Sequence, residues 1–188
     1  MATAIVPAAG AAARFGGPKL AVDVGGRTLL DRTIESLLDG GFTEVIVVVP
    51  PVAPWMSEIR SLRDPRVSTV VNDDPSRGMF SSIQAGVRAA MTAPIGVLPG
   101  DMPFVRVATI TQLLAAAAGG TGSVVPRYDG RRGHPIVMPA AVRAAIAAAP
   151  AGGNLKDVLT RPPQFRIDLD VDDPGVLRDV DRPEDLST

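Results

Sequence analysis

The chain has 188 residues, with 19 Lys and Arg, 20 Asp and Glu, and no cysteine. Its formal net charge of −1 gives no reason to expect binding to a nucleic-acid backbone or to an anionic membrane. The lack of cysteine excludes disulfides, thiolate metal sites and cysteine nucleophiles. The length predicts a single domain over residues 1–188, large enough to bury roughly 70% of its unfolded surface.

Two features of the sequence predict a soluble cytoplasmic protein. The apolar N-terminal segment has no basic residues ahead of it, whereas a secretory signal peptide begins with them. The most apolar interior run, Val45 to Val49, ends at Pro50 and is far too short to span a membrane.

Candidate strands and helices alternate along the chain. The continuous β-branched run at 45–49 is typical of a strand buried in a parallel sheet, and apolar residues three or four apart over 28–39 indicate a helix. This alternation predicts an α/β fold, a doubly wound, mostly parallel sheet flanked by helices, with ligands beyond the carboxyl ends of the strands. Further strands are expected at 67–71, 95–98 and 123–125, and further helices at 57–62, 80–91, 107–118 and 140–149.

The first strand candidate runs into a loop, within residues 5–19, that is made almost entirely of small residues. Glycine and alanine leave backbone N–H groups uncovered, and Arg14 and Lys19 add positive charge, so the loop predicts a phosphate site. Pro18 precedes Lys19, which does not fit a Walker A loop, and Ala12 stands where a dinucleotide fingerprint has glycine. The pattern therefore indicates a phosphate loop of another kind.

A second loop, at 72–82, leads from a strand candidate into a helix. Ser81 or Ser82 is a natural N-cap for this helix, and capping alone would account for both serines. Alternatively, the helix N-terminus and its hydroxyl groups face a bound nucleotide. The two interpretations are compatible.

A third loop places one carboxylate, Asp101, where the strand candidate at 95–98 ends, beside Gly100. A lone aspartate in a turn is often only a turn former. Its position beyond a parallel strand favours a ligand for Mg²⁺, which prefers hard oxygen donors completed by substrate phosphates and waters.

The order of these loops resembles the MobA-like nucleotidyltransferase family. The resemblance implies that the first loop wraps the triphosphate of a nucleotide, with Arg14 and Lys19 on its phosphates, and that Asp101 binds Mg²⁺. It also implies that the residues matching Gly78 and Ser82 lie against the base and sugar. The motif of the first loop is Pro7-Ala8-Ala9-Gly10, then Arg14-Phe15-Gly16-Gly17-Pro18-Lys19, and that of the second is Asn72 followed by Gly78-Met79 and Ser81-Ser82.

The acidic C-terminus resembles the closing motif of the same family, in which alternate carboxylates return to the metal. Asp179 and Asp181 match those carboxylates, and on a strand both would point to the same side. A run of charges is otherwise usually a solvated face.

The remaining third of the chain is expected to hold the acceptor, so that 1–105 form a nucleotide-binding half and 106–188 an acceptor-binding half. The only histidine, His134, lies in an Arg-Gly-His-Pro segment that resembles the lining of the acceptor cleft, although a lone histidine is more often structural. Lys156 stands close to where the family often has arginine.

The resemblance implies a Mg²⁺-dependent nucleotidyltransferase with Arg14, Lys19 and Asp101 as catalytic residues. The Ala8-Ala9-Gly10 form is typical of the cytidylyl branch, and the whole pattern is most similar to those members that transfer CMP from CTP to molybdopterin and release pyrophosphate. A molybdenum hydroxylase would then be a further partner. The methylerythritol-phosphate cytidylyltransferases also use Pro-Ala-Ala-Gly and are the first alternative, although they typically carry lysine where this chain has Asp179. Alternatives are a guanylyltransferase, a sugar- or polyol-phosphate nucleotidyltransferase of the same fold, or a non-catalytic carrier of molybdenum cofactor.

Overall fold

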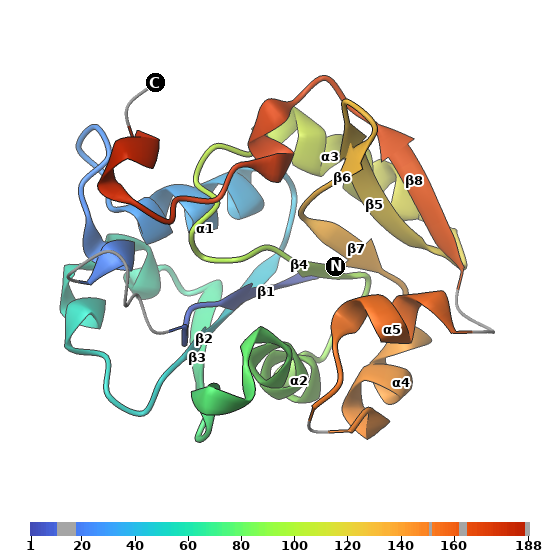
Figure 1. Cartoon of the computed structure of the whole chain (residues 1–188), viewed down its shortest axis with the longest axis horizontal. Helices are drawn as coiled ribbons and strands as arrows, with labels where there is room; N and C mark the ends of the chain where they lie inside the picture. The colour runs from blue at the N-terminus through green and yellow to red at the C-terminus, as the bar shows by residue number, and fades with distance from the viewer. Residues whose placement is uncertain (11–17, 151, 162–164, 187–188) are drawn as a thin grey trace.

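A twisted sheet divides the molecule into two layers of helices (Figure 1). The computed structural model describes residues 1–10, 18–150, 152–161 and 165–186. Within these ranges the sheet has eight strands in the order β3-β2-β1-β4-β7-β5-β6, and β8 pairs with β5. No helix in the same ranges is long and apolar enough to cross a membrane.

The first half of the sheet is parallel, as the sequence predicts. Strand β1 pairs with β2 on one side and β4 on the other, and β2 pairs with β3. The second half is mixed, because β7 runs antiparallel to both β4 and β5 while β8 runs parallel to β5. The strands are β1 (Thr3–Pro7), β2 (Glu44–Val49), β3 (Val67–Val71), β4 (Ile95–Val97), β5 (Ser123–Tyr128), β6 (Arg131–Arg132), β7 (Ile136–Met138) and β8 (Arg166–Asp170).

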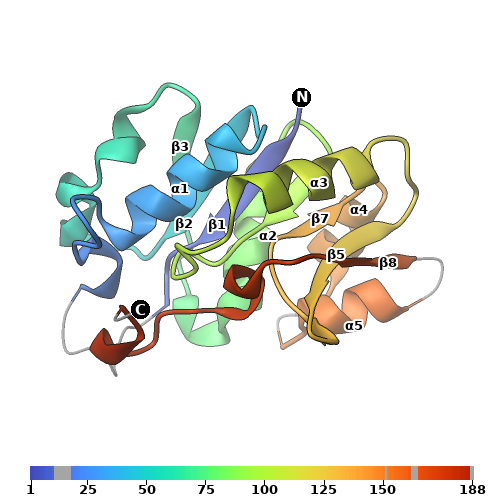
Figure 2. The same cartoon turned by 90° about the horizontal axis from the view of Figure 1, so that it is seen from above.

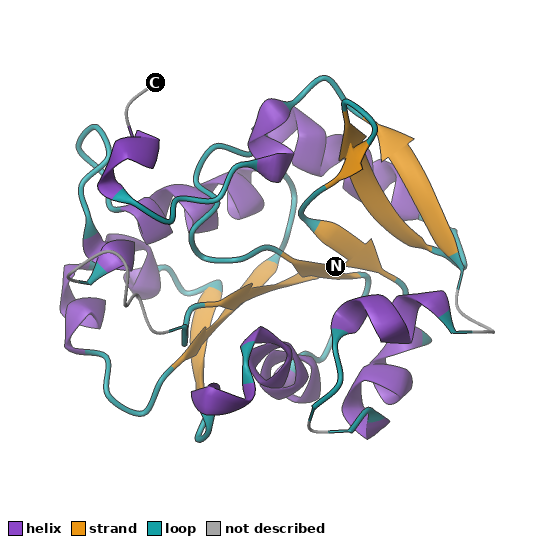
Figure 3. Cartoon of the chain, viewed as in Figure 1, coloured by secondary structure: helices purple, strands orange, loops and turns teal. Residues whose placement is uncertain are grey.

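Helices α1 (Leu29–Asp39) and α3 (Val107–Ala117) cover one face of the sheet, and α2 (Met79–Ala89), α4 (Val142–Ala148) and α5 (Leu155–Thr160) cover the other (Figures 2 and 3). Successive residues of a strand point to opposite faces, so Val6 belongs to the core under α1 and α3 whereas Ile5 belongs to the core under α2. Both side chains are fully buried. The predicted α/β class with a mostly parallel sheet is confirmed.

Several local predictions differ from the structure. The weak helix expected at 57–62 is replaced by two 3₁₀ helices, Pro54–Glu58 and Arg60–Arg63. Strand β3 is an edge strand with exposed residues, because its outer side has no partner strand. Helix α2 ends at Ala89, which leaves Met91 exposed. The strands at 131–132, 136–138 and 166–170 were not expected.

The expected serine N-cap of α2 is also wrong. Gly78 occupies the N-cap position with φ of +84°, a conformation that glycine adopts without steric cost. Ser81 and Ser82 therefore lie in the first turn of the helix, where both side chains are buried.

A buried carboxylate, Asp31, fixes the start of α1. Its oxygens accept hydrogen bonds from the Thr28 hydroxyl at 2.8 Å and from the Ser61 backbone N–H at 2.8 Å. Burial acts to raise the pKa of Asp31, but the hydrogen bonds from Ser61 and Thr28 outweigh it and the pKa is lowered. The negative charge therefore stabilises the junction between α1 and the segment after β2.

We predict that Asp31→Asn lowers the free energy of unfolding by about 2 kcal/mol at neutral pH. The NH₂ group of asparagine would replace one carboxylate oxygen and would face the Thr28 hydroxyl or the Ser61 N–H, both of which donate to Asp31 and would lose an acceptor. Since the folded-state pKa lies below the ordinary 3.8, this stabilisation is complete above that value and is lost as the pH falls through the folded-state pKa. Urea unfolding of both proteins from pH 7 down to acid checks this. The exposed Asp39→Asn on the same helix is the control, and an equal loss there would contradict the prediction.

Candidate functional site

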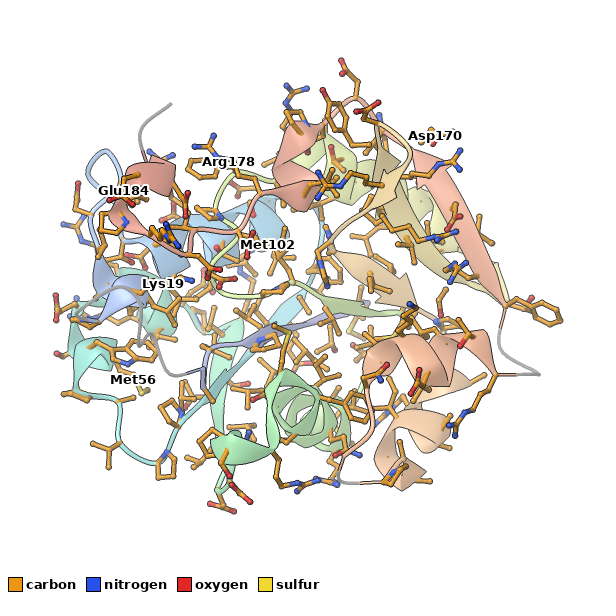
Figure 4. The ribbon with its side chains drawn as sticks, in the orientation of Figure 1. Lys19, Met56, Met102, Asp170, Arg178 and Glu184 are labelled. Carbon is orange, nitrogen blue, oxygen red and sulfur yellow. The ribbon has the colours of Figure 1, made fainter. Side chains whose placement is uncertain are left out.

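A cavity of about 800 Å³ opens where the carboxyl ends of the parallel strands meet. It crosses the edge of the sheet from the side covered by α1, where Lys19 lies, to the start of α2 on the other side (Figures 1 and 4). The lining residues come from six separate stretches of the chain: Pro7, Ala8, Ala9, Gly10, Pro18, Lys19, Leu20, Pro50, Val52, Trp55, Pro75, Ser76, Gly78, Met79, Ser82, Pro99, Asp101 and Asp181.

The first predicted loop forms the middle of the cavity. The backbone is held in place by hydrogen bonds from Ala8 N to Val48 O at 2.8 Å and from Gly100 N to Pro7 O at 3.0 Å. A Cβ atom on Gly10 would meet no atom within 4 Å, so the space beside this residue is open. A ligand can therefore approach the main chain there closely. Arg14, the predicted second cation of the loop, lies outside the described residues.

Lys19 lies at the charged end of the cavity between two carboxylates. Its Nζ donates to Asp101 Oδ2 at 2.8 Å and to Asp181 Oδ1 at 3.1 Å, and its side chain is only 9% exposed. Burial acts to lower the pKa of Lys19, but the hydrogen bonds and charges of the two aspartates outweigh it and the pKa is raised. The buried ammonium group is therefore kept charged.

The C-terminal segment 171–186 crosses the edge of the sheet and brings Asp181 to Lys19. Its path is fixed by a hydrogen bond from Val180 N to Asp101 O at 2.9 Å and by the carboxylate of Asp185, which accepts from the backbone N–H groups of Asp181 and Arg182. These two bonds lower the pKa of Asp185. Figure 4 labels Arg178 in the same segment, and its guanidinium stacks 3.9 Å from the Phe104 ring centroid.

Asp173, 1% exposed, anchors the start of this segment to α3. Its carboxylate accepts hydrogen bonds from Arg106 N at 2.9 Å, Thr109 Oγ1 at 2.7 Å and Gly175 N at 2.9 Å. The carboxylates of the acidic C-terminus therefore have different structural roles: Asp173 anchors the segment and Asp181 contacts Lys19. Asp168 and Asp170 instead form ion pairs with arginines of β5, β6 and β8 on the surface, where Figure 4 labels Asp170.

The start of α2 forms the opposite wall of the cavity. Of the nucleotide contacts expected from this loop, Gly78 and Ser82 line the cavity, but Asn72 is not among the lining residues. Asn72 is 6% exposed, and its side-chain amide donates to the hydroxyl oxygens of Ser81 and Ser82 in the first turn of α2.

An apolar wall that no motif predicted completes the site. Val52 and Trp55 follow the carboxyl end of β2, and Met79 begins α2. Val52 is 80% and Met79 52% exposed, so the wall is open to solvent. Val52 and Trp55 could be anticipated only from their position after a buried parallel strand, because the sequence there has only Pro50-Pro51 and an isolated tryptophan.

Besides Asn72, three predicted residues of the described chain do not line the cavity: Asp179, His134 and Lys156. Residues 179–181 lie in a loop, so the strand on which Asp179 and Asp181 were expected to share a side is not formed. Burial lowers the pKa of His134, and the negative charges of Asp101 and Asp179 act in the opposite direction. Lys156 is exposed on α5.

Two carboxylates reach the cavity with an orientation that suits a hard cation. Asp101 and Asp181 converge on the single ammonium group of Lys19, and among the described residues no cluster of three or more His, Asp or Glu side chains could hold a metal ion. One or two carboxylates completed by phosphate oxygens and waters are the usual ligands of Mg²⁺. The donor set therefore fits a divalent cation that arrives with a phosphorylated ligand.

Uncovered backbone beside a buried cation, at the carboxyl edge of a parallel sheet, defines a site for a phosphorylated ligand. Residues 4–165 match the MobA-like NTP transferase domain family. The chain belongs to this family, and it is accordingly an enzyme of the nucleotidyltransferase type.

Individual relatives carry different names. The chain is 36% identical to the nicotine blue oxidoreductase of Paenarthrobacter nicotinovorans over 98% of its own length and 94% of that protein. It is 23% identical to the molybdenum cofactor cytidylyltransferase of Escherichia coli, over 98% and 93% of the two chains. Among solved structures, Rv0371c of Mycobacterium tuberculosis in complex with manganese is 25% identical and has a TM-score of 0.72, with 97% and 94% of the chains covered.

We predict that Lys19→Met loosens the segment around Val180, because two carboxylates are left facing each other without their shared cation. Hydrogen exchange of the Val180 amide, which is bonded to Asp101 O, should become at least about tenfold faster. The amide of Val171, which is bonded to Arg127 O, should not change. Lys156→Met, at an exposed lysine far from this segment in sequence, is the matched control, and equal acceleration in both variants would contradict the assignment.

Proposed function

We propose that the enzyme is a Mg²⁺-dependent nucleotidyltransferase that transfers CMP from CTP to a phosphorylated acceptor, with molybdopterin as that acceptor. The observation that carries the proposal is the arrangement of Lys19, Asp101 and Asp181 at one end of a cavity whose middle exposes the Gly10 backbone. Family membership supports a nucleoside triphosphate, such as CTP, as the donor.

The cavity suggests how the nucleotide lies. Its phosphates would follow the backbone at Ala9 and Gly10 toward Lys19, and the base would extend toward Ser82 and the apolar wall of Val52, Trp55 and Met79. A volume of about 800 Å³ lies within the range of small-molecule sites.

The reaction needs no protein nucleophile, only positioning and charge stabilisation. A terminal phosphate oxygen of the acceptor attacks the α-phosphorus in line and forms the new P–O bond, while the bond to the bridging oxygen of the β-phosphate breaks and pyrophosphate leaves. Lys19, kept charged by its two aspartates, neutralises the negative charge that grows on the leaving group, and Arg14 of the same loop is proposed to assist.

We propose that Asp101 and Asp181 hold the Mg²⁺ ion. When bound, the ion supplies charge neutralisation and alignment for the phosphates. The manganese complex of Rv0371c supports a divalent cation on this fold.

Molybdopterin as acceptor is supported by the name of the Escherichia coli relative, and a molybdenum hydroxylase would then receive the product. His134 and Lys156 remain the proposed acceptor contacts. Neither side chain lines the cavity, so this role requires the acceptor to extend beyond it. The proposed cytoplasmic location follows from the same biosynthetic role.

A second candidate is an oxidoreductase, favoured by the relative that is 36% identical over nearly the whole chain. The chain has no cysteine, so electrons for such a reaction would come from a bound donor molecule, for example a reduced nicotinamide dinucleotide in the same cavity. Oxidation of such a dinucleotide by an aromatic acceptor, without pyrophosphate release from any nucleoside triphosphate, would favour this function over nucleotidyl transfer.

We predict that the protein with Mg²⁺ releases pyrophosphate from CTP in the presence of molybdopterin, and does so more slowly with GTP or ATP. Lys19→Ala should lower turnover by about a hundredfold or more, because it removes charge stabilisation of the transition state. The measurement is a coupled pyrophosphate assay, run also with a sugar phosphate and a polyol phosphate as acceptors. Unchanged turnover of Lys19→Ala would contradict the role of this residue.

We predict that Asp101→Asn and Asp181→Asn each raise the Mg²⁺ concentration for half-maximal turnover about tenfold or more, because each removes one proposed ligand charge. Asp179→Asn is the matched control, since Asp179 lies two residues from Asp181 but outside the cavity lining. A large effect of Asp179→Asn with none of Asp181→Asn would reverse the assignment.

A further inference from the structure

The orientation of the Asn72 amide is fixed by its three neighbours. Its Oδ1 accepts the backbone N–H of Asp74 at 3.2 Å, so its NH₂ group must face the other way. There it donates to Ser81 Oγ at 2.8 Å and to Ser82 Oγ at 3.0 Å. Both protons of the amide are therefore used on the two serine oxygens.

Because each serine oxygen accepts a proton from Asn72, each hydroxyl proton must point elsewhere. The Ser81 hydroxyl donates to Gly78 O at 2.8 Å, so its proton points to the backbone at the N-cap of α2. For the Ser82 hydroxyl proton, no acceptor is found within the described parts of the chain, and Ser82 lines the cavity. Its oxygen is thus an acceptor toward the protein and its proton is available to the ligand.

We infer that Asn72 is a positioning residue that makes the Ser82 hydroxyl a hydrogen-bond donor to a carbonyl oxygen of the nucleotide's base. This inference rests on the proposed function and extends it from a nucleotide site to the way the base is read. Ser82, in the first turn of α2, lines the same cavity as Lys19, which is proposed to bind the phosphates. A buried site that presents a donor rejects a ligand without a matching acceptor, because the donor is then left unpaired.

Asn72→Asp tests the inference with almost no change in side-chain volume. A carboxylate oxygen in place of the NH₂ group accepts protons from the serines, so the Ser82 proton turns away from the cavity and a lone pair faces the base carbonyl. Trp55 lines the same cavity and is the only tryptophan, so its fluorescence measures ligand binding directly.

The Kd of CTP is expected to rise about tenfold in Ser82→Ala, and at least as much in Asn72→Asp. In the Asn72→Asp/Ser82→Ala double variant the rise should be no greater than in Asn72→Asp alone, because both changes act through one hydroxyl. Ser81→Ala is the matched control, since its hydroxyl touches the same amide but donates to Gly78, and its Kd for CTP should stay within about twofold. The Kd values of inorganic tripolyphosphate and ribose 5-triphosphate, which lack the base, should not change in any variant.

The outcomes distinguish a failure of the inference about Asn72 and Ser82 from a failure of the proposed nucleotidyl transfer. Wild-type affinity of Ser82→Ala for CTP would overturn the inference while leaving nucleotidyl transfer intact, and it decides the question even if Asn72→Asp fails to fold. An equal loss of tripolyphosphate binding in Asn72→Asp would reduce Asn72 to a structural role, and an equal loss of ribose 5-triphosphate binding in Ser82→Ala would move the contact to the sugar. A wild-type protein that binds tripolyphosphate but not CTP would overturn the proposed function as well.

Discussion

The site depends on one ion-pair cluster, Lys19 between Asp101 and Asp181. A buried lysine without partners would lose its charge, and two close carboxylates without a cation would repel each other. Each group is therefore stable only because the others are present. The cluster joins Lys19 to residues that lie 82 and 162 positions away in the sequence, so it also fixes where the C-terminal segment crosses the edge of the sheet.

The parallel half of the sheet explains why such distant segments meet. Strands β1, β2, β3 and β4 all end at the same edge, so the loops that follow them converge on one cavity. The C-terminal segment is not part of this arrangement and needs its own anchors, which are the buried carboxylate of Asp173 at α3 and the hydrogen bond between Val180 and Asp101. In the proposed function, a phosphorylated ligand that bound Lys19 would compete with Asp181 for the same ammonium group, and ligand binding would then be coupled to the position of this segment.

The sequence predicted the features that depend on local patterns. The helical spacing of apolar residues located α1, the β-branched run located β2, and the small-residue loop and Asp101 located two walls of the cavity. It missed β7, which has only three residues, and β8, whose alternation of Ile167 and Leu169 with charged residues was interpreted as an acidic run. The Val52 and Trp55 wall could not be found from a motif, because it depends only on which loop lies beside the cavity.

Two pairs of polar residues, Asp179 with Asp181 and Ser81 with Ser82, differ from the local sequence pattern for the same physical reason. Asp179 and Asp181 were paired by the two-residue period of a strand, yet residues 179–181 lie in a loop held by hydrogen bonds to Asp101 O and to the Asp185 carboxylate, and Asp181 is the one that bonds to Lys19. Ser81 and Ser82 were interpreted as caps, but Gly78 with its positive φ begins the helix and releases both hydroxyls from capping. In each case a tertiary partner, Lys19 for Asp181 and Asn72 for the serines, decides the direction of the polar group. The chemistry of this cavity therefore depends on polar side chains oriented by residues distant in sequence, and this level of structure is the one that a local pattern does not encode.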